Sequence, residues 1–304
     1  MRNFLVLAMV GLAAQMVDGS LGMAYGVTSS TLLLAAGVAP AAASAAVHFS
    51  EIGTTLASGI SHHRLGNVDW RTVSILAVPG AVGAFAGATL LASLPGDVAK
   101  PWVAAILLSL GIYVMYRFLV MRGRRPQFPG RLSARFLAPL GLVAGAIDAI
   151  GGGGWGPVGT TTLLSSGRLE PRKVVGSIDT SEFLVAIGGS LGFLLALGSQ
   201  GIAWQIAGAL LLGGVIAAPF AAWLVRHLPA TVLGVAAGGV IVLTNSKTLL
   251  ESAGAAGQTV ATAAGVLALL WLATLTVAIR DHRRHRSVTG HSGDVVVETQ
   301  SAAI

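Results

Sequence analysis

Long stretches of this chain contain no Asp, Glu, Lys or Arg. These charge-free runs cover residues 72–96, 101–116, 183–203, 205–225 and 256–279. At 1.5 Å per helical residue, the longer runs can each cross the roughly 30 Å of hydrocarbon in a bilayer. A water-soluble domain carries about 25% charged residues, whereas only 10% of these 304 residues are charged. The runs therefore predict an all-α polytopic membrane protein.

The basic residues lie mostly at the ends of the apolar runs. The formal net charge is +7, but this distribution is typical of the positive-inside rule and not of a nucleic-acid-binding face. We expect a multi-pass protein of the cell (inner or plasma) membrane, surrounded by lipid bilayer, with no nucleic-acid partner; a homo-oligomer is left open. Cysteine is absent, which excludes disulfides, thiolate metal sites and a thiol nucleophile.

The chain contains an internal repeat. A shift of 130 residues aligns 11–37 with 141–167 and gives 10 identities in 27 positions. The identities include the only acidic residues of the two windows, Asp18 and Asp148. A duplicated unit is therefore expected. With small gaps the match continues through Ser50-Glu51 with Ser181-Glu182, Trp70 with Trp204, and Leu94-Pro95 with Leu228-Pro229.

Each unit opens with about 34 mainly apolar residues, 4–37 and 134–167, interrupted in the middle by glycines. One straight helix of that length would be about 50 Å long, so each segment is either a broken span or a re-entrant hairpin of two half-helices. Single broken spans would divide the Lys and Arg residues 10 inside to 9 outside. Two hairpins would invert the second unit and place 16 of the 19 in the cytoplasm. The positive-inside rule therefore favours two inverted-topology repeats.

The expected organisation is two repeats, each a re-entrant or broken hairpin followed by three transmembrane helices, plus one extra C-terminal helix. The first repeat covers 1–121, with hairpin 4–37 and helices 40–61, 72–92 and 98–117. A cytoplasmic linker, 122–133, leads to the second repeat, 134–250, with hairpin 134–167 and helices 174–197, 204–225 and 230–250. The extra helix is 257–279, followed by a polar cytoplasmic tail, 281–304.

Six ionisable residues lie in the expected spans or breaks, where a charge costs at least about 2.5 kcal/mol at mid-depth. The repeat places His48 at the position of Asp179, and Glu51 at that of Glu182. For these four we expect a proton-coupling or pathway role. The remaining two precede the glycine breaks and could either share that role or cap the half-helices. The six are Asp18, His48, Glu51, Asp148, Asp179 and Glu182.

Glycines followed by hydroxyl residues begin the second half of each opening segment. Free N–H groups and a partial positive charge at such an N-terminus suit an anion. Because the predicted mid-membrane core has no Lys or Arg, an anionic substrate would be held there. The same small residues could instead serve helix packing. The candidate substrate-binding residues are Gly22, Gly26, Thr28, Ser29, Gly152, Gly154, Gly156, Thr160 and Thr161.

We predict no metal site. The adjacent residues His62 and His63 point in different directions on a helix, and the sequence near them has no further His or Cys. A solvated loop is the expected environment for this pair.

Three motifs occur together in the first unit: GLAAQMVDGSLGMAYG at 11–26, LLLAAGVAP at 32–40 before an alanine-rich helix, and HHRLGNVDW at 62–70. In combination they resemble the sulfite exporter TauE/SafE family of membrane permeases, over about residues 4–250. The resemblance implies export of sulfite or a related small sulfur-containing organic anion, with no cofactor. The chain departs from the family pattern at 43–46 and His48.

We therefore expect a secondary transporter, not an enzyme, with the two breaks meeting near the midplane and alternating access around them. Coupling of this transport to protons is left open. Two alternatives belong to other classes. A non-transporting membrane partner protein is one. The other is an intramembrane aspartyl protease with Asp18 and Asp148 as its dyad, although both aspartates precede their glycines and the Gly-x-Gly-Asp signature is missing.

Overall fold

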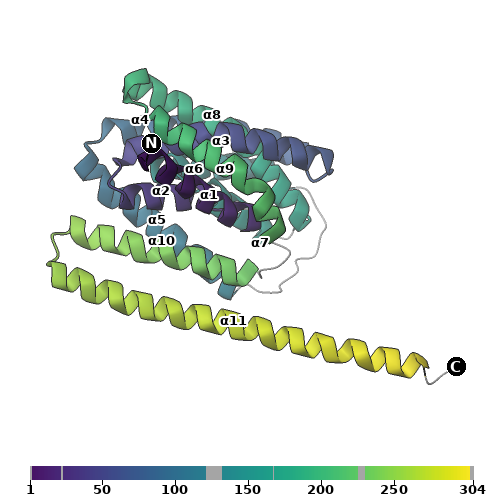
Figure 1. Cartoon of the computed structure of the whole chain (residues 1–304). Helices are drawn as coiled ribbons and strands as arrows, with labels where there is room; N and C mark the ends of the chain where they lie inside the picture. Colours follow the sequence, from purple (N-terminus) through teal and green to yellow (C-terminus); the bar gives the residue numbers. More distant parts are fainter. Residues whose placement is uncertain (1, 22, 121–131, 167, 225–229, 302–304) are drawn as a thin grey trace.

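The computed structural model describes residues 2–21, 23–120, 132–166, 168–224 and 230–301. Within these ranges the chain forms eleven α-helices and one π-helix, and no β-strand. Helices α1 to α10 are gathered into a bundle, and α11 lies along one side of it (Figure 1). The prediction of an all-α protein is confirmed.

The first opening segment is broken into α1 (Arg2–Leu21) and α2 (Tyr25–Ala35), which pack against each other. Three longer helices follow: α3 (Pro40–Arg64), α4 (Trp70–Ser93) and α5 (Gly96–Leu119). Pro40 occupies the first helical position of α3, where its missing N–H has no intrahelical partner to lose. Asp69 caps α4 by accepting a hydrogen bond from Thr72 N at 2.7 Å.

The second opening segment comprises α6 (Ala134–Gly151), a π-helix η1 (Trp155–Thr160) and α7 (Thr161–Ser166). Gly152 ends α6 in the left-handed conformation, with φ 67°. Pro157 lies in η1 and has no N–H to donate to a regular α-helical ladder. The unit continues with α8 (Pro171–Gly201), α9 (Trp204–Leu224) and α10 (Ala230–Ser252).

Six described helices are long and apolar enough to cross a membrane. They are Trp70–Ser93, Gly96–Leu119, Ala134–Gly151, Arg172–Gly201, Thr231–Ser252 and Gly257–Asp281. Five lie where transmembrane helices are expected. The sixth is α6, the first half of an opening segment, and its 18 residues give a length of about 27 Å. The second opening segment thus contains one helix of nearly membrane thickness before its break.

The two units are interleaved. The first helix of each unit packs on the second long helix of the other: α1 on α9, and α6 on α4. Helices α3 and α8 pack together, as do α5 and α10. A Cβ added to Gly11 would strike the backbone of Leu210, and one added to Gly141 would lie 2.6 Å from the carbonyl oxygen of Leu76. Glycine therefore permits close helix contact at equivalent positions of both units.

Helix α11 (Gly257–Ser301) lies outside this core and contacts α10. Trp271 Nε1 donates to Val235 O at 3.0 Å across that contact. Figure 1 shows the yellow end of α11 extending well beyond the other helices. The helix continues through 281–301, where a polar tail is expected from the sequence. Most of the expected linker, 122–131, lies outside the described residues.

Candidate functional site

The two breaks in the opening segments lie against each other. A Cβ added to Gly26 would be 2.7 Å from Gly153 Cα and 2.8 Å from Gly152 O. Ser30 Oγ donates to Gly152 O at 2.5 Å. Residues about 130 positions apart in the sequence are therefore in backbone contact, and Gly26 has no room for a side chain.

A small pocket lies at this junction. Its walls come from both breaks and from α8, and none of its lining residues is Lys or Arg. Thr28, Ser29, Thr160 and Thr161 are buried without lining the pocket, as is Gly152. Gly22 lies outside the described residues. The expected site residues that line the pocket are Asp18, Gly26, Asp148, Gly154, Gly156, Asp179 and Glu182.

The aspartate before each break caps the helix after it. Asp18 Oδ1 accepts from Tyr25 N at 3.1 Å. Asp148 Oδ1 accepts from Gly154 N at 2.7 Å and from Trp155 N at 2.9 Å. Tyr25 and Trp155 are themselves 130 residues apart, so the cap is repeated in both units. These carboxylates therefore already accept hydrogen bonds from some of the N–H groups that we expected to face an anion.

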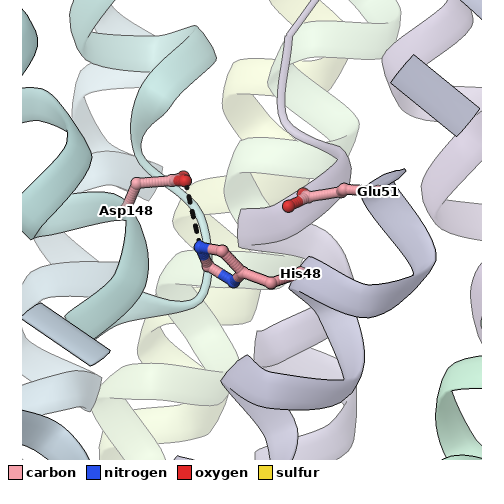
Figure 2. A group of neighbouring side chains, drawn as sticks. All are labelled: His48, Glu51 and Asp148. Atoms are coloured by element: carbon pink, nitrogen blue, oxygen red, sulfur yellow. Dashed lines mark ion pairs between the residues drawn. The ribbon is translucent and has the colours of Figure 1, made fainter. Parts of the chain in front are cut away.

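Three ionisable side chains meet next to the second break. One nitrogen of His48 and one carboxylate oxygen from each of Glu51 and Asp148 lie within 4.8 Å of one another. His48 Nε2 lies 3.3 Å from Asp148 Oδ2. Figure 2 shows the Glu51 carboxyl group directed toward the gap between the other two side chains. We call these three residues the buried trio, because each is at most 1% exposed.

The sequence contained part of the signal for the buried trio. His48 and Glu51 are three residues apart on α3 and so share a helix face. Asp148 comes from α6 of the other unit. The repeat gives His48 and Asp179 equivalent positions in the two units. Nothing in the sequence indicates that the imidazole of His48 faces Asp148.

A second group of acidic residues faces the pocket from the first break and from α8. We call Asp18, Asp179 and Glu182 the pocket trio, since all three line the pocket. Asp179 also accepts a hydrogen bond from Ser58 Oγ and lies 3.5 Å from His62 Nε2. The expected solvated loop at His62 is wrong, because this residue lies in the last turn of α3. A histidine of one unit thus approaches an aspartate of the other.

Several polar residues that hold the site were not singled out in the sequence. The hydroxyl of Tyr25 donates to Leu210 O at 3.2 Å, and Trp155 Nε1 donates to Ile178 O at 3.1 Å. Asn245 Nδ2 donates to Thr31 Oγ1 at 2.9 Å. Tyr25 and Trp155 occupy equivalent positions of the repeat. This equivalence was the sequence signal that could have indicated their role in holding the site.

A family model described as "Sulfite exporter TauE/SafE" matches residues 7–248. The chain is 52% identical over 254 residues to a Bacillus subtilis protein named "Probable membrane transporter protein YtnM", covering 83% of this chain and 84% of the relative. A second Bacillus subtilis protein, "Probable membrane transporter protein YdhB", is 28% identical over 142 residues, covering 46% and 58%. Among solved structures, none matches this chain.

Proposed function

This chain belongs to the sulfite exporter TauE/SafE family of membrane transporters, and from that premise we propose that it exports sulfite or a related small sulfur-containing anion. The observation that carries the proposal is the pocket where the two broken segments meet. Broken helices that meet inside a bundle are typical of substrate sites in secondary transporters. The chain acts in this proposal as a multi-pass permease, and not as an enzyme.

In this proposal a small oxyanion contacts backbone and hydroxyl groups at the pocket, which has to widen first because its cavity volume is only about 10 Å³. Gly154 lines it just before η1, Gly156 lines it from η1, and Gly26 lines it from α2. In this proposal the ligand contacts the backbone of these residues. The hydroxyls of Thr28 and Thr160 are buried without a hydrogen-bond partner among the described residues. In this proposal they stabilise a ligand that penetrates deeper, each by about 1 kcal/mol.

The carboxylates of the pocket oppose an anion unless they are neutralised. The carboxyl groups that line it are the pocket trio and Asp148, with Tyr25 as a further titratable group and no lining Lys or Arg to balance them. Like charges at close range repel each other strongly in a medium of low dielectric constant. We therefore infer that an anion binds only when Asp179 and Glu182 carry protons. Anion binding and proton binding then favour each other, and the linkage is reciprocal.

The test measures protons taken up when sulfite binds to the purified protein. Isothermal titration calorimetry in buffers of different ionisation enthalpy, at one pH, gives this number for the wild type and for Glu182→Gln. We expect the variant to bind sulfite with about one proton fewer, since the amide needs no proton. The ligand's own protonation is the same in both measurements and cancels. Absence of sulfite binding by the wild type would refute the substrate, whereas equal proton uptake would refute only the coupling.

We also propose that the two units are inverted with respect to each other in the membrane. Two observations support this: the reciprocal packing of α1 on α9 and of α6 on α4, and the placement of 16 of 19 basic residues in the cytoplasm by the inverted arrangement. Because the chain lacks cysteine, single cysteines at 96 and 200 can be labelled selectively, and we expect both to react from outside. A cysteine at 2 that labels only from the cytoplasm would contradict the inversion.

A further inference from the structure

The polar atoms that face one another in the buried trio lack hydrogen-bond partners among the described residues. They are His48 Nε2, both carboxylate oxygens of Glu51, and Asp148 Oδ2. His48 Nε2 and Asp148 Oδ2 lie 3.3 Å apart without forming a hydrogen bond. A buried carboxylate without a partner costs several kcal/mol. The centre of the trio therefore calls for a positively charged occupant.

The outward-facing atoms of the same side chains are held firmly. His48 Nδ1 lies 3.0 Å from the carbonyl oxygen of Ser44. A carbonyl can only accept, so Nδ1 carries the hydrogen and a neutral imidazole presents the lone pair of Nε2 to the trio. Asp148 Oδ1 is fixed by the backbone N–H groups of Gly154 and Trp155, which leaves Oδ2 directed inward. Metal ligands are oriented by outer contacts of this kind.

We propose that His48, Glu51 and Asp148 bind one divalent transition-metal cation of the Zn²⁺ class. Donor atoms that share such an ion at about 2.0–2.2 Å lie roughly 3.3–3.6 Å apart in tetrahedral geometry. His48 Nε2 and Asp148 Oδ2 already have this separation, at 3.3 Å. The trio's donor atoms span at most 4.8 Å, so a movement of the Glu51 carboxyl group of about 1 Å completes the set.

The composition of the trio selects the class of cation. An imidazole nitrogen suits Zn²⁺ and its neighbours in the first transition row, whereas Ca²⁺ and Mg²⁺ prefer ligand sets of oxygen alone. Two ionised carboxylates with a neutral imidazole carry a charge that one divalent ion balances. Three protein ligands also leave a coordination position open.

The ion links the two units beside the pocket. His48 and Glu51 belong to α3 of the first unit, and Asp148 belongs to α6 of the second. Glu51 Oε1 would lie 3.0 Å from a Cβ on Gly26, which lines the pocket. The ion thus supplies positive potential next to a pocket that lacks Lys and Arg. This last link rests on the proposed anion substrate, whereas the metal site itself does not.

The test is metal retention by the full-length protein, purified through a tag without histidine, incubated with Zn²⁺ and desalted in the absence of sulfite. Mass-spectrometric metal analysis should find about one Zn²⁺ per wild-type chain. Glu51→Gln and Asp148→Asn should each lower the retained metal at least tenfold, or about 1.4 kcal/mol in binding free energy. Asp148→Asn keeps an oxygen for the backbone cap, so it removes chiefly the ligand.

The matched control is Glu251→Gln, which makes the same change at an exposed residue of α10 paired with Lys247 and should retain the metal. A wild-type protein that retains no Zn²⁺, and shows no ligand-field absorption with Co²⁺, would overturn the proposal, because the trio would then be neutralised by protons. Equal loss from Glu251→Gln and Glu51→Gln would also overturn it, since metal retention would then not depend on the trio. Neither result depends on whether sulfite is transported.

Discussion

The buried trio and the pocket trio occupy equivalent positions of the sequence repeat, yet their environments differ. In the buried trio a histidine stands where the pocket trio has Asp179, and its members are at most 1% exposed. The Asp179 side chain is 20% exposed and lines the pocket. The buried trio thus has a nitrogen donor and almost no exposure, which suits a metal, although its Asp148 also lines the pocket. The pocket trio has carboxyl groups alone. The same scaffold can carry two chemistries because burial and donor type are set locally.

The two breaks also differ in the residues they place at the contact between them. At the first break Met23 carries a buried side chain, whereas its counterpart at the second break is Gly153. A Cβ on Gly153 would strike the backbone of Gly26 and Val27, and its φ of 154° disfavours any other residue. The close approach therefore requires glycine on both sides, Gly153 at the second break and Gly26 after the first.

The largest effect is expected from Gly153→Ala, which would abolish this close approach. Overpacking against backbone together with the strained φ should cost roughly 3 kcal/mol or more. Thermal unfolding of the purified protein in detergent measures the change. Gly208→Ala is the matched control, because a Cβ there meets nothing within 4 Å. If both variants unfold at the wild-type temperature, the breaks are not in contact as described.

An intermediate effect is expected from removing the caps. Asp148→Ala leaves two backbone N–H groups of the second break without an acceptor, and Asp18→Ala leaves one at the first. The expected losses are about 2 kcal/mol and about 1 kcal/mol respectively. Both variants can be compared by the unfolding temperature in the same detergent. A larger loss for Asp18→Ala would show that the first break depends more heavily on its cap than the second.

The smallest effect is expected from Ala24→Gly. Ala24 has φ 97°, the positive-φ conformation that glycine adopts without strain, while its counterpart Gly154 has an extended φ of −178°. Relief of that strain is worth about 1 kcal/mol, and the greater freedom of the unfolded chain offsets part of it. We expect a small rise in unfolding temperature. A clear fall would mean that the Ala24 methyl group contributes packing that exceeds the strain.

Much of the architecture could be predicted from the sequence. The charge-free runs determined an all-helical membrane protein, since backbone groups in hydrocarbon must be paired within helices. The repeated Asp and Gly residues placed both breaks, and the motifs at 11–26 and 62–70 indicated the family that the match over 7–248 shows. The inversion of the units, the hairpin topology and the roles of the site residues stay predictions.

Only the tertiary structure decided which side chains meet. The repeat gives His48 and Asp179 equivalent positions, which does not predict what either side chain contacts. In the structure the imidazole of His48 faces Asp148, and His62 approaches Asp179. Periodicity reports which residues share a helix face, because that depends on neighbours three or four residues away. It carries no information on how one helix is rotated against another, which is settled by close packing at positions such as Gly141 and Gly11. The helices and their breaks therefore follow from the local sequence pattern. The buried trio forms only because the helices of the two units pack between one another.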